Sequence, residues 1–389
     1  MKKSLVLMAM AGVALAGCVN DVADVAQNQE QKKVKIAFDT PVLYNNAESR
    51  ANFFGEIGSH QYTQGGTVYS YPKEENFIIY AVAHEGSFTG WKTTEEFAFN
   101  NTSIGHDVRV DGWAPKKSDN SYYYWPSGKL MTFAASSPAD LAVTGVNRTY
   151  GATGLTITDF EIAGDASKQY DLLFSKRAVN KSSADMSHSA SYYSGVALEF
   201  QHALSSIRFS LSNTSGETVV LTKISLYGVK YKGDFAENLT EGTDKTIYDR
   251  DGDDANVSPA WDLEDDLVAA TTPYVGFSGT ATFPESPKYV SEVEGMTGTC
   301  SHLLLMPQEL TGDVKIKVDY TVNGEEAHKI VTLDGLKDLN NRSVDEWIMG
   351  VRYTYRLVYD AASADKDKIY FAPSTDAWIE HDVVVVPLI

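Results

Sequence analysis

Residues 196–211 alternate between apolar and polar positions, with a change of phase near the middle. The apolar residues fall first on even and then on odd positions: Val196, Leu198 and Phe200, then Ile207, Phe209 and Leu211. Because side chains alternate between the two faces of a strand, one unbroken strand cannot hold both phases. We therefore predict a bend or a change of sheet within residues 201–206, at the seam between two β domains. One irregular strand with a bulge is the alternative.

Short alternating segments lie on both sides of this seam. They occupy residues 77–83, 121–126, 130–135, 155–160, 171–175, 218–231, 314–322 and 351–359. Clusters of Gly, Asn, Ser and Pro separate them, and residues 334–347 are the one candidate for a short helix. This pattern is typical of β-sandwiches and predicts an all-β fold. The expected units are an N-terminal sandwich at 51–199 and a C-terminal sandwich at 200–389.

The N-terminus has the pattern of a processed export signal. An apolar run at residues 5–16 follows two lysines and leads into Leu-Ala-Gly-Cys18. The run is too short to span a bilayer permanently, and it resembles the lipobox of bacterial lipoproteins. That resemblance implies removal of signal peptide 1–17 and lipidation of Cys18; an ordinary secretory signal is the alternative. Lipidation of Cys18 leaves Cys300 alone, so no intramolecular disulfide is expected.

Residues 18–50 combine a tether with a strand. Residues 19–32 are polar and lack aromatic side chains, so they cannot bury enough surface to offset ordering. Residues 34–44 then carry apolar side chains on one parity: Val34, Ile36, Phe38, Val42 and Tyr44. Pro41 removes a hydrogen-bond donor, which predicts a position at a sheet edge. Residues 45–50 form a polar loop of the kind that proteases cut.

Composition and charge narrow the function classes. The 389 residues are 43% hydrophobic, which is enough for two cores. The 33 Lys and Arg against 52 Asp and Glu give a net charge of −19. Such a surface repels phosphate backbones, so nucleic-acid binding is not expected.

No pattern of catalytic residues stands out, and we predict a non-enzymatic protein without cofactor or metal. The eight histidines are scattered, and HExxH, G-x-S-x-G and P-loop motifs are absent. Cys300 and His302 could share a strand face and form a reactive pair, but a small core residue is the preferred interpretation of Cys300. His202 is interpreted as structural, bonding a backbone carbonyl. One acidic turn does not match a calcium loop; its carboxylates are Asp249, Asp251 and Asp253.

Several segments together resemble the fimbrillin-like (Mfa-like) pilus-subunit family of Bacteroidales. They are Tyr123-Tyr124-Trp125-Pro126 with residues 130–138, then residues 169–174, 200–209, 303–310 and 347–357, and Trp378. The resemblance implies two tandem transthyretin-like β-sandwich domains, a lipoprotein precursor and assembly into a surface fimbria.

The same resemblance implies a role for the strand at residues 34–44. In such precursors an arginine-specific protease removes the first strand, and a strand of another subunit fills the groove by β-strand addition. The candidate bond here is Arg50–Ala51. If five apolar side chains leave at about 1.5–3 kcal/mol each, the vacancy is worth roughly 10 kcal/mol. The alternative is that Arg50 is a plain loop residue and the strand is permanent.

The predicted donor strand lies at the C-terminal end of the sequence. Its apolar residues fall on both parities: Val383, Val384, Val385, Val386, Leu388 and Ile389. A strand with two apolar faces must be covered on both. The alternative is a central strand of the second sandwich, which would make the subunit a tip or accessory pilin.

The leading hypothesis is a fimbrial subunit at the cell surface that mediates adhesion. Its partners would be other copies or related pilins, an arginine-specific surface protease, and the outer membrane through lipid on Cys18. The alternative is a non-polymerising surface lipoprotein or tip adhesin that binds a host glycan or protein. Sugar rings stack on exposed aromatic faces, and the candidates are residues 122–125, Trp91 and Trp113.

Overall fold

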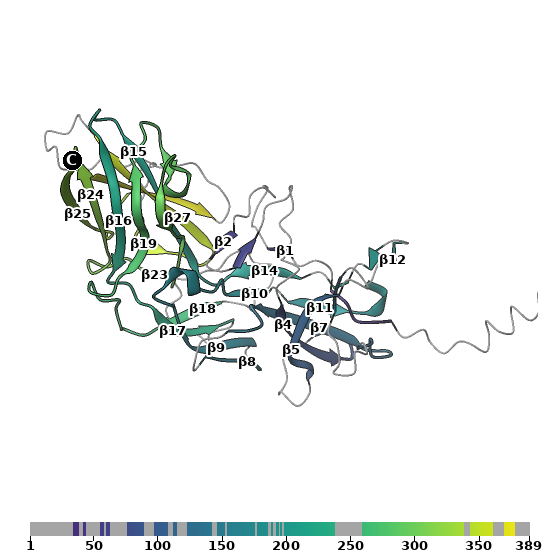
Figure 1. Ribbon diagram of the computed structural model, residues 1–389. Helices are drawn as coiled ribbons and strands as arrows, with labels where there is room; N and C mark the ends of the chain where they lie inside the picture. Colours follow the sequence, from purple (N-terminus) through teal and green to yellow (C-terminus); the bar gives the residue numbers. More distant parts are fainter. Residues whose placement is uncertain are drawn as a thin grey trace, which may run out of the picture.

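In the computed structural model, most of the residues that are described belong to β-strands (Figure 1). The described residues are 34–38, 42–43, 55–57, 60–62, 76–88, 97–107, 112–114, 123–141, 146–151, 154–175, 177–185, 188–189, 192–193, 195–196, 198–237, 259–337, 343–360 and 369–377. Within these ranges the only helical elements are three 3₁₀ turns: η2 (Ala166–Lys168), η3 (Ser183–Asp185) and η4 (Val290–Glu292). The chain is therefore all-β, as the alternating pattern predicted.

An eight-stranded sheet is built from eight of the strands that precede β15 (Ser205–Asn213). Its order is β1-β14-β10-β7-β4-β5-β6, and β11 pairs with β7 off this path. The strands are β1 (Val42–Leu43), β4 (Phe77–His84), β5 (Phe97–Asp107), β6 (Gly112–Ala114), β7 (Leu130–Ser137), β10 (Leu173–Ser175), β11 (Ala178–Lys181) and β14 (Glu199–His202). β4 and β7 are almost wholly buried, because both faces of the central strands are covered.

Two five-stranded sheets follow the seam and pack face to face. The first has the order β20-β15-β27-β28 with β22 on β15, and the second has the order β21-β19-β16-β24-β25. The Phe209 ring of β15 lies against Gly276 of β19, where a Cβ atom would come within 2.5 Å of the ring. The strands are β15 (Ser205–Asn213), β16 (Val219–Tyr227), β19 (Tyr274–Thr282), β20 (Lys288–Tyr289), β21 (Thr297–Cys300), β22 (Leu303–Leu305), β24 (Lys315–Val322), β25 (Glu325–Thr332), β27 (Val351–Tyr359) and β28 (Ile369–Ala377).

A four-stranded sheet joins strands from both sides of the seam. Its order is β18-β17-β9-β8, in which β9 and β17 pair along Lys232↔Glu161 to Ala236↔Thr156. The strands are β8 (Asn147–Gly151), β9 (Gly154–Glu161), β17 (Lys232–Ala236) and β18 (Ala260–Leu263). Three two-stranded ladders complete the fold: β2 (Gly55–Ile57) with β3 (His60–Tyr62), β12 (His188–Ser189) with β13 (Tyr192–Tyr193), and β23 (Gln308–Glu309) with β26 (Glu346–Trp347).

A buried carboxylate fixes the end of β17 against β8 and β9. Glu237 is 2% exposed, and its Oε2 accepts hydrogen bonds from the Tyr150 hydroxyl and, at 2.9 Å, from the Leu155 backbone N–H. Its Oε1 accepts from Arg177 Nε at 2.9 Å. Burial raises the pKa of Tyr150 well above its usual value, and the adjacent carboxylate adds to the rise. The phenol therefore stays a donor to Glu237.

The change of sheet falls inside the predicted range 201–206. β14 ends at His202 and β15 begins at Ser205, so only Ala203 and Leu204 connect the two sheets. Ala203 donates its N–H to Leu172 O at 2.8 Å and accepts at its carbonyl from Trp261 Nε1 at 2.6 Å. These bonds hold the turn from both sides.

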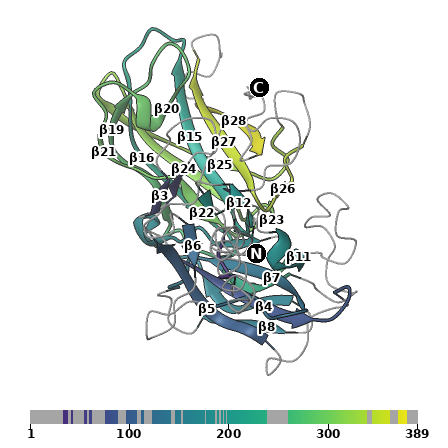
Figure 2. The same cartoon turned by 90° about the vertical axis from the view of Figure 1, so that its right-hand side faces the viewer.

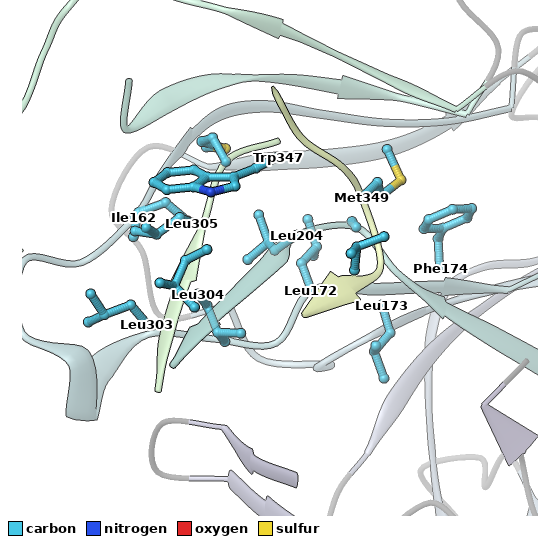
Figure 3. Packing of buried hydrophobic residues seen from close by; sticks show 14 of the residues in the cluster. Ile162, Leu172, Leu173, Phe174, Leu204, Leu303, Leu304, Leu305, Trp347 and Met349 are labelled. Carbon is cyan, nitrogen blue, oxygen red and sulfur yellow. The ribbon is translucent and has the colours of Figure 1, made fainter. Parts of the chain in front are cut away.

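Apolar side chains fill the space around this turn (Figure 3). Nearly all of the buried apolar residues that the structure describes belong to one contiguous cluster. At the seam its members come from loops and strands of both halves: Ile162, Leu172, Leu173, Phe174, Leu204, Leu303, Leu304, Leu305, Trp347 and Met349. Viewed from the side, the sheets of the two halves lie one above the other and meet at this layer (Figure 2).

The helix proposed for residues 334–347 is wrong for the residues described there. Residues 334–337 form a turn with a single bridge, Lys337↔Ser343, and β26 follows. Leu336, Val344 and Trp347 are buried in the core.

Candidate functional site

The N-terminal segment 34–38 lies between two other parts of the chain, to which isolated β-bridges at Lys35 and Phe38 connect it. On one side it pairs antiparallel with residues 113 and 123–125. Phe38 N–H donates to Trp113 O at 2.7 Å, and Trp113 N–H donates back to Phe38 O at 3.2 Å. Farther along, Ile36 N–H donates to Tyr123 O at 2.9 Å, and Trp125 N–H donates to Val34 O at 2.9 Å. The segment thus provides hydrogen-bond partners for backbone groups of Trp113, Tyr123 and Trp125.

On the other side the segment runs parallel to residues 195–196. Val196 N–H donates to Ala37 O at 2.9 Å, and Phe38 forms a parallel bridge with Val196. β1 continues this side, pairing parallel with β14. β1 is an end strand of its sheet, but Phe38 has partners on both sides, so the predicted edge position is wrong for Phe38. A proline removes the hydrogen-bond donor at its own position only, so other residues of the same segment can be paired on both sides.

Apolar and aromatic side chains line the place where this segment lies. Ile36 is 2% exposed and Phe38 is fully buried. The Phe38 ring meets Phe77 edge-on at a centroid distance of 6.0 Å and Phe133 at 5.5 Å. Phe77 also contacts the Trp113 and Phe200 rings, both at 5.6 Å. Taking the segment away would leave a groove lined by rings.

The predicted site residues divide into those that the structure describes and those that it does not. Val34 is half-buried against the core, and Ile36 and Phe38 are buried. The backbone of Val42 lies in β1. The following lie outside the described residues: Cys18, Tyr44, Arg50, Ala51, Val383, Val384, Val385, Val386, Leu388 and Ile389.

Sequence reasoning missed the walls of the groove. Phe77 and Phe133 belong to predicted strands, but nothing in their pattern pointed to the N-terminal segment. Trp113 stands in a polar stretch and was considered only as a sugar platform. Gly195 was not considered, although an added Cβ there would come within 2.3 Å of Phe38 C. A glycine next to an alternating strand is a weak signal for close backbone approach.

The aromatic candidates for sugar stacking are mostly buried. Trp113 is fully buried and Trp125 is 9% exposed, edge-on to Phe133 at 5.7 Å. Tyr123 packs against Phe99 at 4.8 Å. Within the described residues of this group, Tyr124 alone is exposed, at 41%. Trp91 and Tyr122 lie outside the described residues.

The titratable side chains considered as catalytic candidates have surroundings that favour a structural role. They are Cys300, His302 and His202. Cys300 is half-buried in β21, opposite Phe277 in the register. Burial, reinforced by nearby Arg352, lowers the pKa of His302 to about 3, so this imidazole is neutral at physiological pH. His202 Nδ1 lies 2.8 Å from Asp171 Oδ1, so its partner is a carboxylate and not the backbone carbonyl expected.

The remaining site types give no further candidate. Asp249, Asp251 and Asp253 lie outside the described residues. In the part of the chain that the structure covers, His, Cys, Asp and Glu side chains form no group of three or more suited to a metal ion. No helix among the described residues is long and apolar enough to cross a bilayer.

Comparison with known proteins identifies a family. A model of the family described as fimbrillin-like matches residues 72–373. No curated protein matches the chain. Solved structures with a similar arrangement include a fimbrial protein from Bacteroides vulgatus, with 16% identity, a TM-score of 0.48, and coverage of 78% of this chain and 92% of that one.

Two further structures are candidate cell adhesion proteins. The one from Bacteroides uniformis has 12% identity and a TM-score of 0.46, with 90% of this chain and 100% of that chain covered. The one from Bacteroides ovatus has 14% identity and a TM-score of 0.43, with 90% and 99% covered.

Proposed function

The chain belongs to the fimbrillin-like family, and we propose that it is a structural subunit of a surface fimbria that assembles by strand exchange and mediates adhesion. The family is one of fimbrial and adhesion proteins, not of enzymes. In this proposal the precursor is exported as an outer-membrane lipoprotein through Cys18. A surface protease cleaves it after Arg50, and residues 383–389 of another subunit refill the groove. The single observation that carries the proposal is the inserted segment 34–38.

The energetics of this segment favour capture of another strand after its removal. Ile36 and Phe38 together account for about 3–6 kcal/mol of apolar burial. Removal would also leave the Trp113, Trp125 and Val196 N–H groups without the acceptors they now have. An unpaired buried backbone group is costly, and each new hydrogen bond contributes about 0.5–1.5 kcal/mol net. An empty groove would therefore strongly favour a new strand.

The test of the proposal is proteolysis of the purified full chain without its lipid. An arginine-specific protease is expected to release the residues up to Arg50, as shown by intact mass, and the cleaved protein should then form multimers at high protein concentration. Size-exclusion chromatography and boiled against unboiled gels would reveal them, because exchanged strands separate only on boiling. Arg50→Lys keeps the charge but not the cleavage site, so that variant should remain a monomer.

Three outcomes would change the proposal. A clean cut that leaves a stable monomer even at high protein concentration would favour the tip adhesin or anchored surface lipoprotein. Polymerisation of cleaved protein lacking residues 383–389 would refute the donor assignment alone. Membrane association of Cys18→Ser equal to that of the parent, measured by fractionation of cells, would refute the lipid anchor alone.

A further inference from the structure

The backbone of segment 34–38 passes Gly195 in direct contact. A Cβ atom on Gly195 would lie 2.3 Å from Phe38 C and 2.4 Å from both Ala37 O and Phe38 Cα. The next residue, Val196, donates its N–H to Ala37 O at 2.9 Å. One peptide unit of the inserted strand is therefore fixed sterically at residue 195 and by a hydrogen bond at residue 196, which sets its register in the groove.

Once the register is set, each side chain of the inserted strand has a defined place. Phe38 is fully buried, and its ring lies at 85° to Phe77 and at 87° to Phe133. Such edge-to-face contacts require an aromatic ring and are lost with an aliphatic side chain. Ile36, two positions earlier, is 2% exposed, and Ala37 between them is 5% exposed on the opposite face. Both faces of this triplet are covered.

We propose that the groove binds most tightly an incoming strand with an aliphatic–small–aromatic triplet, supplied by a partner subunit other than a copy of this chain, and that the tail of a copy binds there more weakly. The proposal rests on the strand-exchange function proposed above and specifies its partner. Residues 379–389 contain no Phe, Tyr or Trp, and Val383–Val386 is a run of β-branched side chains. Whichever of these residues took the place of Phe38, the ring contacts would be lost and a void would remain. The tail of this chain therefore binds the groove of another kind of subunit in preference to the groove of a copy of this chain.

The test measures peptide binding to the full chain cleaved after Arg50, from which the released segment has been removed by gel filtration in urea below the unfolding midpoint. A fluorescent peptide of residues 33–43 is the probe, read by anisotropy. The matched control peptide exchanges Ile36 and Phe38, so its composition and hydrophobicity are unchanged. We expect the exchanged peptide and the peptide of residues 379–389 each to compete at least about tenfold more weakly than the parent peptide.

A protein variant tests the register separately. Gly195→Ala should weaken every peptide alike, because its Cβ meets backbone and not a particular side chain. Gly164→Ala is the control, since nothing lies within 4 Å of the added atom. Equal binding by the exchanged peptide, or tighter binding by residues 379–389, would overturn the triplet while strand exchange stands. Failure of the parent peptide to bind cleaved protein would refute strand exchange in this groove, and the triplet with it.

Discussion

The buried carboxylate of Glu237 gives a sharp test of how the four-stranded sheet is held. Its two oxygens accept from Tyr150, Leu155 and Arg177, and the Glu237 and Arg177 side chains are only 3% and 9% exposed. A hydrogen bond to a charged group contributes about 1.5–3 kcal/mol, and breaking a buried ion pair costs about 3–5 kcal/mol. Glu237→Gln keeps the size but removes the charge. We expect it to lower the free energy of unfolding by about 3 kcal/mol.

Urea denaturation followed by tryptophan fluorescence would measure this loss. Arg177→Met and the double variant complete a cycle, in which the double variant should lose at least about 1 kcal/mol less than the sum of the single variants. Asp265→Asn is the control, because Asp265 pairs with Lys230 at 2.9 Å but is 99% exposed. That change should leave stability unaltered, since exposed pairs contribute little. Additive single losses, or a Glu237→Gln effect as small as the control, would refute the reasoning.

Two further predictions concern a glycine and a histidine. Gly228 and Gly216 share a φ of 77°, but a Cβ on Gly228 would lie 1.8 Å from Asp313 O, whereas none would meet an atom at Gly216. Both variants, Gly228→Ala and Gly216→Ala, carry a backbone strain cost of about 1 kcal/mol. Gly228→Ala should lower the thermal midpoint much more than Gly216→Ala, because only its Cβ atom collides with the backbone. Equal shifts of the two midpoints would contradict this. His302, with a pKa of about 3 when folded, takes up a proton on unfolding below its usual pKa of about 6.5. Stability should fall as the pH drops from 6.5 toward 3, by up to about 1.4 kcal/mol per unit, and urea titrations of His302→Gln should show a shallower fall; parallel profiles would contradict this.

Alternation in the sequence located many of the strands but not their partners. β27 begins and ends where the pattern of residues 351–359 predicted, and the phase change at 201–206 matches the passage from β14 to β15. In contrast, β5 was missed because its centre reads Asn-Asn-Thr-Ser. The parallel pairing of β15 with β27 was also beyond reach, since alternation defines faces and leaves the neighbour open.

Burial of the second face of these strands was the least predictable feature. Arg208, Arg352 and Arg356 occupy positions that alternation assigned to the polar side, yet they are 7%, 2% and 9% exposed. Arg208 lies over the Tyr289 ring at 3.9 Å, and its Nε donates to Thr354 Oγ1 at 2.6 Å. A guanidinium can be buried when its donors and its flat face have such partners. Those partners lie far away in the sequence, so the local pattern does not predict the burial.

One part of the candidate site, the N-terminal segment, could be predicted from the sequence, whereas the residues that surround it could not. The apolar parity of residues 34–38 identified the inserted strand, because a strand carries its own signal. The groove is assembled from Phe77, Trp113, Phe133 and Gly195, which lie in separate segments of the sequence. Only the folded chain brings them together, so periodicity along the sequence could not reveal them.

The pairing of β15 also determines the order in which the molecule can be completed. The described strands that border β15 all come later in the chain, and the bonded residues Arg208 and Thr354 are 146 positions apart. Closing so long a loop costs entropy before any contact is gained, which slows folding. In a chain delivered from its N-terminus, Ile207, Phe209 and Leu211 wait for nearly the entire remaining length before β27 arrives. During that interval the half-built sheet exposes apolar side chains and unpaired strand edges, which make it prone to aggregate.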